Sequence, residues 1–114
     1  MSKSVSNFLC HLKDECAFIE KHTVDLSEDE FYNKKILQKA LVRSLEVIGE
    51  ASKSISIEER NTYSEVPWGK MIEIADNGTY RYFNIDYKTV YTTCTDVIPD
   101  IHLQLKEVLK EIKE

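Results

Sequence analysis

The side chains best suited to phosphate chemistry lie in residues 79–87, which read Thr-Tyr-Arg-Tyr-Phe-Asn-Ile-Asp-Tyr. Arg81 carries a permanent, forked cation that can pair with phosphoryl oxygens. Tyr80 and Tyr82 stand on either side of it. A phenol, with an ordinary pKa of about 10, can donate a hydrogen bond or serve as a nucleophile, but it is a poor general base at pH 7. The segment could therefore contact a phosphate, but it contains no group that exchanges protons near neutral pH.

Histidine, with an ordinary pKa of about 6.5, is the usual side chain for moving protons near neutral pH. The three histidines lie outside this segment, at His11, His22 and His102. We expect each of them to be a solvated or capping residue on a helix surface. His102 is the one that we consider as a possible substitute catalyst, because it follows the segment on the last predicted helix.

The three cysteines do not indicate a metal or redox site. Cys10, Cys16 and Cys94 form no C-x-x-C pair, and all three fall on or near apolar stripes. His11 directly follows Cys10, so on a helix the two side chains point about 100° apart. We expect buried free thiols, and we expect no metal and no cofactor.

The composition indicates one globular domain spanning residues 1–114, with 42% hydrophobic and 31% charged residues. No apolar run approaches the roughly 20 residues that cross a bilayer, and the first residues do not resemble a signal peptide. We therefore expect a cytoplasmic protein with no membrane contact. The net charge of −5 disfavours tight, sequence-independent RNA binding by a monomer, because phosphate binding depends largely on Lys and Arg.

Apolar residues recur at three- and four-residue steps in four long segments, which predicts four main helices. They cover residues 4–23, residues 34–54, a segment that begins at Pro67, and a last helix that Asp86 caps. Ser27 and Glu30 form a capping box that predicts a short extra helical turn. Asn77-Gly78 should end or distort the third of these helices, and Pro99 should kink the last one. The fold class is therefore all-α, an up-and-down antiparallel four-helix bundle.

The helix over residues 34–54 has an apolar face wider than one neighbouring helix needs. Its main stripe is accompanied on one flank by Ile36, Ala40 and Val47. This width indicates either a central position in the bundle or an additional contact with a partner. We use it as one argument for a homodimer.

Three patches, in order along the chain, resemble HepT-like proteins of the HEPN superfamily. Residues 67–87 contain Pro-Trp and Phe-x-Ile-Asp-Tyr at the family's spacing, residues 41–51 resemble its central helix, and residues 26–31 resemble the turn before that helix. Between Pro-Trp and Phe-x-Ile-Asp-Tyr the family has Arg-Asn, three residues, His, any residue and Tyr. A gapless superposition places Ala75 at the Arg, Asp76 at the Asn, Tyr80 at the His and Tyr82 at the Tyr.

The resemblance implies a HEPN-like bundle from the toxin half of toxin–antitoxin pairs. Active members are metal-independent endoribonucleases whose Arg and His face each other across a symmetric dimer. Ala75 offers neither charge nor donor, Tyr80 cannot replace an imidazole as a base, and Asp76 adds negative charge where RNA phosphate would approach. We expect a catalytically inactive homologue that acts through dimerisation and through binding to a nucleotidyltransferase of the MNT type.

The resemblance also gives roles to residues outside the catalytic pair. Tyr82 matches the tyrosine that the MNT-type partner modifies with AMP, so it is the candidate for AMPylation. Arg43, Glu46 and Glu50 resemble charged positions of the central helix, and we expect them to form an ion pair within the bundle.

Two alternatives remain open at this stage. The chain could be an active RNA endonuclease toxin with a relocated site, in which Arg81 substitutes for the missing Arg beside Tyr80 and His102. It could also be a ligand- or nucleotide-binding helical module, although it has no phosphate-binding loop.

Overall fold

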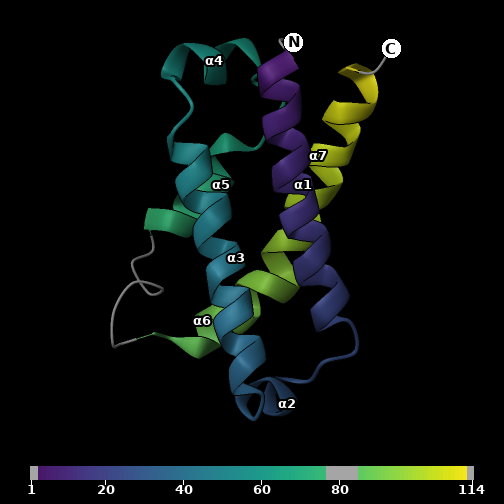
Figure 1. The fold of residues 1–114 in the computed structure, drawn as a ribbon, viewed down its shortest axis with the longest axis vertical. Helices are drawn as coiled ribbons and strands as arrows, with labels where there is room; N and C mark the ends of the chain where they lie inside the picture. The colour runs from purple at the N-terminus through teal and green to yellow at the C-terminus, as the bar shows by residue number, and fades with distance from the viewer. Residues whose placement is uncertain (1–2, 77–84, 113–114) are drawn as a thin grey trace.

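The computed structural model describes residues 3–76 and 85–112, and all regular structure in these residues is helical (Figure 1). The elements in chain order are α1 (Lys3–Thr23), α2 (Glu28–Tyr32), α3 (Lys35–Lys53), α4 (Ile57–Thr62), α5 (Trp68–Asp76), α6 (Tyr87–Thr92), the π-helical turn η1 (Thr93–Val97) and α7 (Ile98–Ile112). The predicted all-α class is confirmed. No helix in the described part of the chain is long and apolar enough to cross a membrane.

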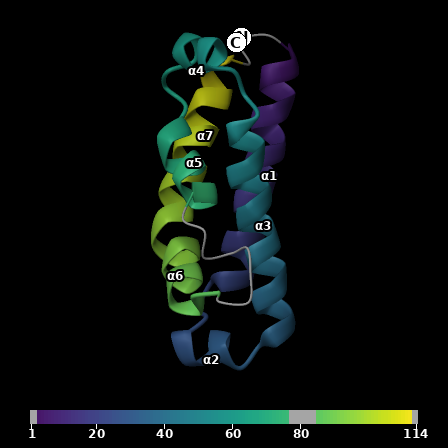
Figure 2. The ribbon, with the colours of Figure 1, turned by 90° about the vertical axis from the view of Figure 1, so that its left-hand side faces the viewer.

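The chain runs up and down an elongated bundle that measures 43 × 27 × 18 Å (Figures 1 and 2). Helices α1 and α7 pack against each other, as do α3 and α5, and α1 also contacts α3. The short helices close the ends, with α2 at one end of the bundle and α4 at the other (Figure 1). The four predicted long helices correspond to α1, α3, α5 and the run from α6 to α7.

Side-chain caps begin three of the described helices: Ser27 caps α2, Ser56 caps α4 and Asp86 caps α6. Ser27 accepts a hydrogen bond from the backbone N–H of Glu30, and the Glu30 carboxylate accepts one from the backbone N–H of Ser27. This is the predicted capping box. Ser56 caps α4 in the same way, by accepting from the backbone N–H of Glu59.

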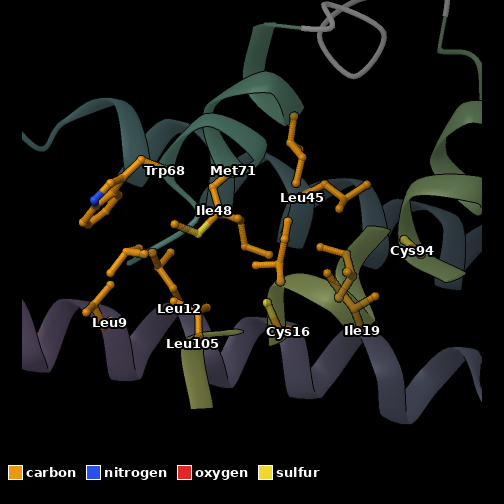
Figure 3. Close-up of a cluster of buried hydrophobic side chains, with 14 of the residues drawn as sticks. Leu9, Leu12, Cys16, Ile19, Leu45, Ile48, Trp68, Met71, Cys94 and Leu105 are labelled. Carbon is orange, nitrogen blue, oxygen red and sulfur yellow. The ribbon is translucent and has the colours of Figure 1, made fainter. Parts of the chain in front are cut away.

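Helix α3 lies centrally, between α1 on one side and α5 on the other. Leu41, Leu45 and Ile48 have no exposed surface. Figure 3 shows Leu45 and Ile48 among side chains from α1, α5, η1 and α7, which together form the hydrophobic core. Most of the apolar width of α3 is therefore used inside one chain. The flank is not buried in this way: Ile36 is 88% exposed, and Ala40 and Val47 are half-buried and outside the core cluster.

Where Pro99 predicts a kink, the last long helix contains a π-helical turn, η1, just before the proline. The backbone N–H of Ile98 donates to the carbonyl of Thr93, five residues earlier. The Thr95 hydroxyl donates to the carbonyl of Tyr91 at 2.9 Å. Proline cannot donate to the helix, so widening the preceding turn lets the chain continue without a break.

The start of α6 is fixed by the Asp86 cap and by a hydrogen bond from Tyr91. Asp86 accepts hydrogen bonds from the backbone N–H groups of Lys88 and Thr89, and its other oxygen accepts from the Thr89 hydroxyl at 2.8 Å. The Thr89 hydroxyl and backbone N–H are the main causes that lower the pKa of the Asp86 carboxyl below its ordinary value. Tyr91, one turn further on, donates to the carbonyl of Leu26 at 2.7 Å, which ties α6 to the turn before α2.

The central position of α3 makes Leu45 a sensitive test of the core. We predict that Leu45→Ala lowers the free energy of unfolding by about 2 to 5 kcal/mol, because it leaves a cavity that three helices cannot close. Chemical denaturation measures this change. Leu103→Ala, at an exposed position of α7, is the matched control and should cost less than about 0.5 kcal/mol. Equal losses in both variants would contradict the assignment of α3 as the central helix.

The Asp86 cap predicts a pH-dependent contribution to stability. The folded state lowers the pKa of this carboxyl, so the cap stabilises fully above the unfolded value of about 3.9 and loses its effect as the pH falls through the folded value. Asp86→Ala should therefore lower the thermal midpoint by a few degrees at pH 7 and have little effect at strongly acidic pH.

Asp86→Asn is the control for this measurement, because Asn caps helices without a charge. Its thermal midpoint at pH 7 should lie close to that of wild type. The contribution of residue 86 to the midpoint should no longer change with pH. A difference between wild type and Asp86→Ala that stays constant down to strongly acidic pH would contradict the role of the charge.

Candidate functional site

The positions that the sequence relates to the family motif lie at the C-terminal end of α5 and in the residues after it. Ala75 and Asp76 are the last two residues of α5. Residues 77–84, which include Tyr80, Arg81 and Tyr82, lie outside the described residues. The roles given to these side chains, and the helix break expected at Asn77-Gly78, therefore stay predictions.

The helix that leads to these positions is held firmly by its first two turns. The indole N–H of Trp68 donates to the carbonyl of Tyr63 at 3.0 Å, while its ring is buried and lies 6.5 Å from the Phe8 ring. Met71 and Ile74 follow in the core. In the sequence, helical spacing predicts an inward stripe made of Trp68, Met71, Ile72 and Ala75. Ile74, which the prediction omitted, is a buried member of this face, so the packing extends to within one residue of Ala75.

The described residues on both sides of the motif segment rest on one helix. Both α5 and α6 contact α3, and Figure 2 shows α5 and α6 in line beside it. Ile85 packs against the core, and Asp86 caps α6 directly after it. The motif segment is thus preceded by the end of α5 and followed by the start of α6, and both helices pack on α3.

A groove of ≈ 310 Å³ lies next to the last turns of α5, between that helix and the η1–α7 segment. Its charged lining consists of Glu73, Asp96 and Asp100, opposed by the single cation Lys70. The lining includes Ile74, the residue directly before Ala75. A surface with three carboxylates repels the phosphates of RNA and provides no imidazole for proton transfer.

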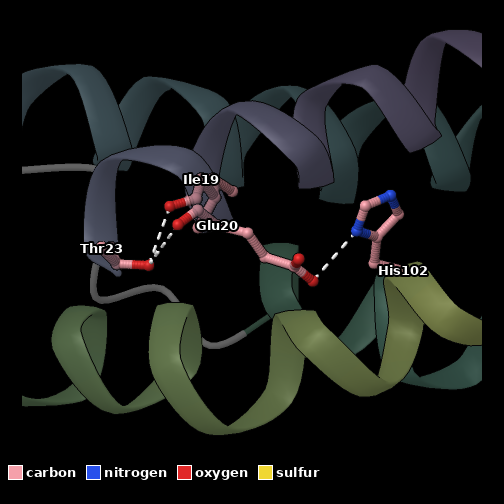
Figure 4. A network of polar contacts seen from close by, with 4 residues as sticks. All are labelled: Ile19, Glu20, Thr23 and His102. Atoms are coloured by element: carbon pink, nitrogen blue, oxygen red, sulfur yellow. Dashed lines mark hydrogen bonds and ion pairs between the residues drawn. The ribbon is translucent and has the colours of Figure 1, made fainter. Parts of the chain in front are cut away.

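His102 lies on a different side of α7 from this groove. It follows Asp100 by two residues, which places it about 200° further around the helix. Its Nδ1 atom is 3.0 Å from Oε1 of Glu20 on α1 (Figure 4). The distance allows an ion pair when the ring is protonated, whereas the angle at Nδ1 does not meet hydrogen-bond geometry. The side chain of His102 therefore serves the contact between α1 and α7.

The prediction that His102 is a surface residue is wrong. It is 8% exposed. The cause is the close packing of α1 on α7, which covers the flank of the stripe that includes Ile101. The sequence shows that α1 contains carboxylates. It does not show that Glu20 is the one that faces the His102 ring.

The other candidate ligands remain apart in the described residues. His11 is exposed, and the His22 ring lies tilted against the Phe18 ring, with the centroids 4.5 Å apart. No group of three His, Cys, Asp or Glu side chains in residues 3–76 and 85–112 could hold a metal ion. The thiols are free, and burial raises the pKa of Cys16 and of Cys94 to about 12, so neither is a nucleophile at neutral pH.

The charged positions of α3 form a contact within one helix. Arg43 Nη1 lies 3.9 Å from Glu46 Oε2, three residues further along, and the Arg43 side chain is largely exposed. An exposed pair of this kind contributes little to stability. The expected ion pair is present, but it lies along the surface of α3 and does not join two helices.

Comparison with known proteins gives consistent results over almost the whole chain. A protein named "Putative RNase" from Caldanaerobacter subterraneus subsp. tengcongensis is 34% identical over 97% of this chain and 99% of its own length. A "Putative RNase" from Methanocaldococcus jannaschii is 35% identical over 97% of this chain and 92% of its own. The "Probable ribonuclease HepT" of Thermococcus cleftensis is 29% identical over 96% of this chain and 100% of its own. No solved structure matches the chain.

A model of the family described as "Ribonuclease HepT-like" matches residues 12–108, from the middle of α1 to near the end of α7. The match includes α5, the motif segment and the Asp86 cap. The relatives and the family model agree with the resemblance found in the sequence: the chain belongs to the HepT-like ribonuclease family.

Proposed function

We propose that this HepT-like protein is a catalytically silent homologue of the metal-independent HEPN endoribonucleases. The observation that carries the proposal is the replacement of the motif Arg and His by Ala75 and Tyr80. Removing the pair takes away both the cation for the phosphoryl oxygens and the proton carrier for the 2′-hydroxyl. The described residues on either side of the motif form a helix that begins at Trp68 and a helix that Asp86 caps.

The electrostatics beside α5 support the proposal. The groove next to the motif helix is acidic, and the chain as a whole carries a net charge of −5. An RNA strand gains affinity mainly by pairing its phosphates with Lys and Arg. A surface of this sign fits a protein that does not need to grip RNA.

An active nuclease with a relocated site is the second candidate, and the names of the relatives, which refer to RNases, favour it. Such a site would need Arg81 and Tyr80 together with His102 as the proton carrier. His102 lies against Glu20 on α1, on the side of α7 away from the groove beside α5. This placement argues against His102 in that role.

The function that remains is association, first as a homodimer and then with an MNT-type nucleotidyltransferase. The symmetric site of the family requires two copies that meet at the motif segment. The main apolar stripe of α3 is buried within one chain, while its flank at Ile36, Ala40 and Val47 stays outside the core, so the dimer is proposed chiefly from the family resemblance. Tyr82 is the proposed site of AMP transfer by the partner.

We predict that the purified protein does not cleave single-stranded RNA and that the triple variant Ala75→Arg, Asp76→Asn and Tyr80→His gains cleavage without added metal. The reason is that the triple variant restores the reacting side chains between the two helices that flank the motif. Gel analysis of a labelled RNA measures the activity. Ala75→Arg alone is the control and should stay inactive, because it restores the cation without the imidazole.

Cleavage by the unmodified protein, abolished by Arg81→Ala, would contradict the proposal and support the relocated site. In that case His102→Gln should also reduce cleavage, whereas a structural His102 would leave it unchanged.

We predict a homodimer at micromolar concentration, measured by analytical ultracentrifugation. Introducing a charge at the motif segment, by Phe83→Glu, should shift the protein toward monomer if the two copies meet there. Leu103→Glu, at an exposed position of α7, is the matched control and should leave the dimer intact. A wild-type monomer under these conditions would count against the symmetric association.

A further inference from the structure

Helix α3 carries a second stripe of side chains that lies outside the hydrophobic core. Ile36, Ala40 and Val47 are not members of the core, and Ile36 is 88% exposed. Arg43, whose side chain is 73% exposed, lies between them. These four residues follow one another at steps of four, three and four residues. We call residues 36, 40, 43 and 47 the outer stripe of α3.

The spacing of the outer stripe is that of a seam between two helices. Alternating steps of three and four residues place side chains along one narrow line of a helix, which is how paired helices meet. The core uses the other side of α3, because the buried Leu45 follows Ile36 by nine residues and thus lies half a turn around the helix. The occupant that fits the outer stripe is therefore another helix.

The outer stripe is complementary to a copy of itself that runs in the opposite direction. In a two-fold dimer every contact occurs twice, once from each copy. With the axis midway between Ala40 and Arg43, Ile36 of one copy lies against Val47 of the other, and Ala40 lies against Arg43. The small Ala40 side chain leaves room for the longer Arg43, whose methylene groups pack on apolar surface while the guanidinium reaches water.

The charges beside the stripe fit the same register. Lys39 directly precedes Ala40, and Glu46 directly precedes Val47, so both lie on one flank of the stripe. In an antiparallel pair this flank of one helix faces the same flank of the other, which brings Lys39 of each copy to Glu46 of its partner. Within the described part of the chain Lys39 is exposed and belongs to no ion pair. Glu46 has only the 3.9 Å contact with Arg43 of its own helix.

We propose that a second copy of this chain packs on the outer stripe, with the two α3 helices antiparallel and the two-fold axis between residues 40 and 43. The inference rests on the proposed homodimer and deepens it by naming its surface. Helices α5 and α6 both contact α3, and Figure 2 shows them beside it. An interface along α3 therefore lies next to the helix ends that flank the motif segment. The inference does not depend on the loss of catalysis.

The area of the contact extends beyond the outer stripe. The stripe spans about 16 Å of helix, which is short for a stable interface of roughly 1,200 Å² or more. Phe18 of α1, 37% exposed, lines one cavity with Ile36 and Ala40, so apolar surface continues from α3 onto α1. A second copy that covers the outer stripe also covers this edge of α1. A helix of a different protein would give no reason for the matching positions of Lys39 and Glu46.

Two charge variants test the register. In a homodimer, Lys39→Glu places two pairs of negative charges at residues 39 and 46, and Glu46→Lys places two pairs of positive charges there. Each variant alone should raise the dissociation constant of the dimer several-fold. Analytical ultracentrifugation at low ionic strength measures the change, because exposed charges are screened least under those conditions.

A mixture of the two variants separates pairing between copies from effects within one chain. In a dimer of one Lys39→Glu chain and one Glu46→Lys chain, residue 39 of each copy again faces the opposite charge at residue 46 of the other. The equimolar mixture should therefore contain more dimer than either variant does at the same total concentration. Charges that acted only on the stability of α3 would not give this recovery.

The apolar part of the stripe is tested by Ile36→Asp, which should raise the dissociation constant about tenfold or more, because it places a carboxylate in the seam. Ile57→Asp is the matched control. Ile57 is a 69% exposed isoleucine in the first turn of α4, at the other end of the bundle (Figure 1), and its variant should dimerise within about twofold of wild type. Circular dichroism and thermal midpoints confirm that the variants fold.

The outcomes distinguish this inference from the proposed homodimer itself. A wild-type monomer at micromolar concentration would overturn both. A dimer that withstands Ile36→Asp and both charge variants but dissociates in Phe83→Glu would overturn the α3 interface and leave the homodimer in place. A mixture that contains no more dimer than the separate variants would contradict the antiparallel register.

Discussion

The burial of α3 on two sides is the constraint on which the rest of the structure depends. Leu41, Leu45 and Ile48 lose all their exposure because α1 covers one side of the helix and α5 the other. The remaining pair, α1 with α7, joins this arrangement through the contact between α1 and α3. Helix α5 therefore takes its place from the packing of Met71 and Ile74, and the motif positions that follow are presented by a hydrophobic interface.

The sequence predicted the fold well where a local rule decides the structure. Apolar periodicity located the long helices to within a residue or two, and the Ser27–Glu30 capping box and the Asp86 cap formed as their spacing indicates. Those rules involve atoms within one or two helical turns. Helix α4 is harder to predict, because its Ser56 cap is a single side chain without an accompanying apolar stripe.

The candidate site was less predictable, because its surroundings depend on which helices meet. The exposure of His102 could not be inferred from α7 alone, since Glu20 and the flank of α1 cover it. Ile74 was missed because an ideal stripe from Met71 points equally well to Ala75. Pro99 predicted a kink. The π-turn that begins at Thr93 could not be predicted from the proline alone, because η1 also packs against α1 and α7. A helical pattern identifies a buried face and leaves open what covers it.

The groove beside α5 also depends on which helices meet. The groove beside α5 collects carboxylates next to a motif whose Arg and His positions hold Ala75 and Tyr80, so its charge and the residues of the motif both oppose phosphate chemistry. Ile36 on α3 is 88% exposed and contributes no burial to the core, and as a β-branched residue it is not a particularly strong helix former.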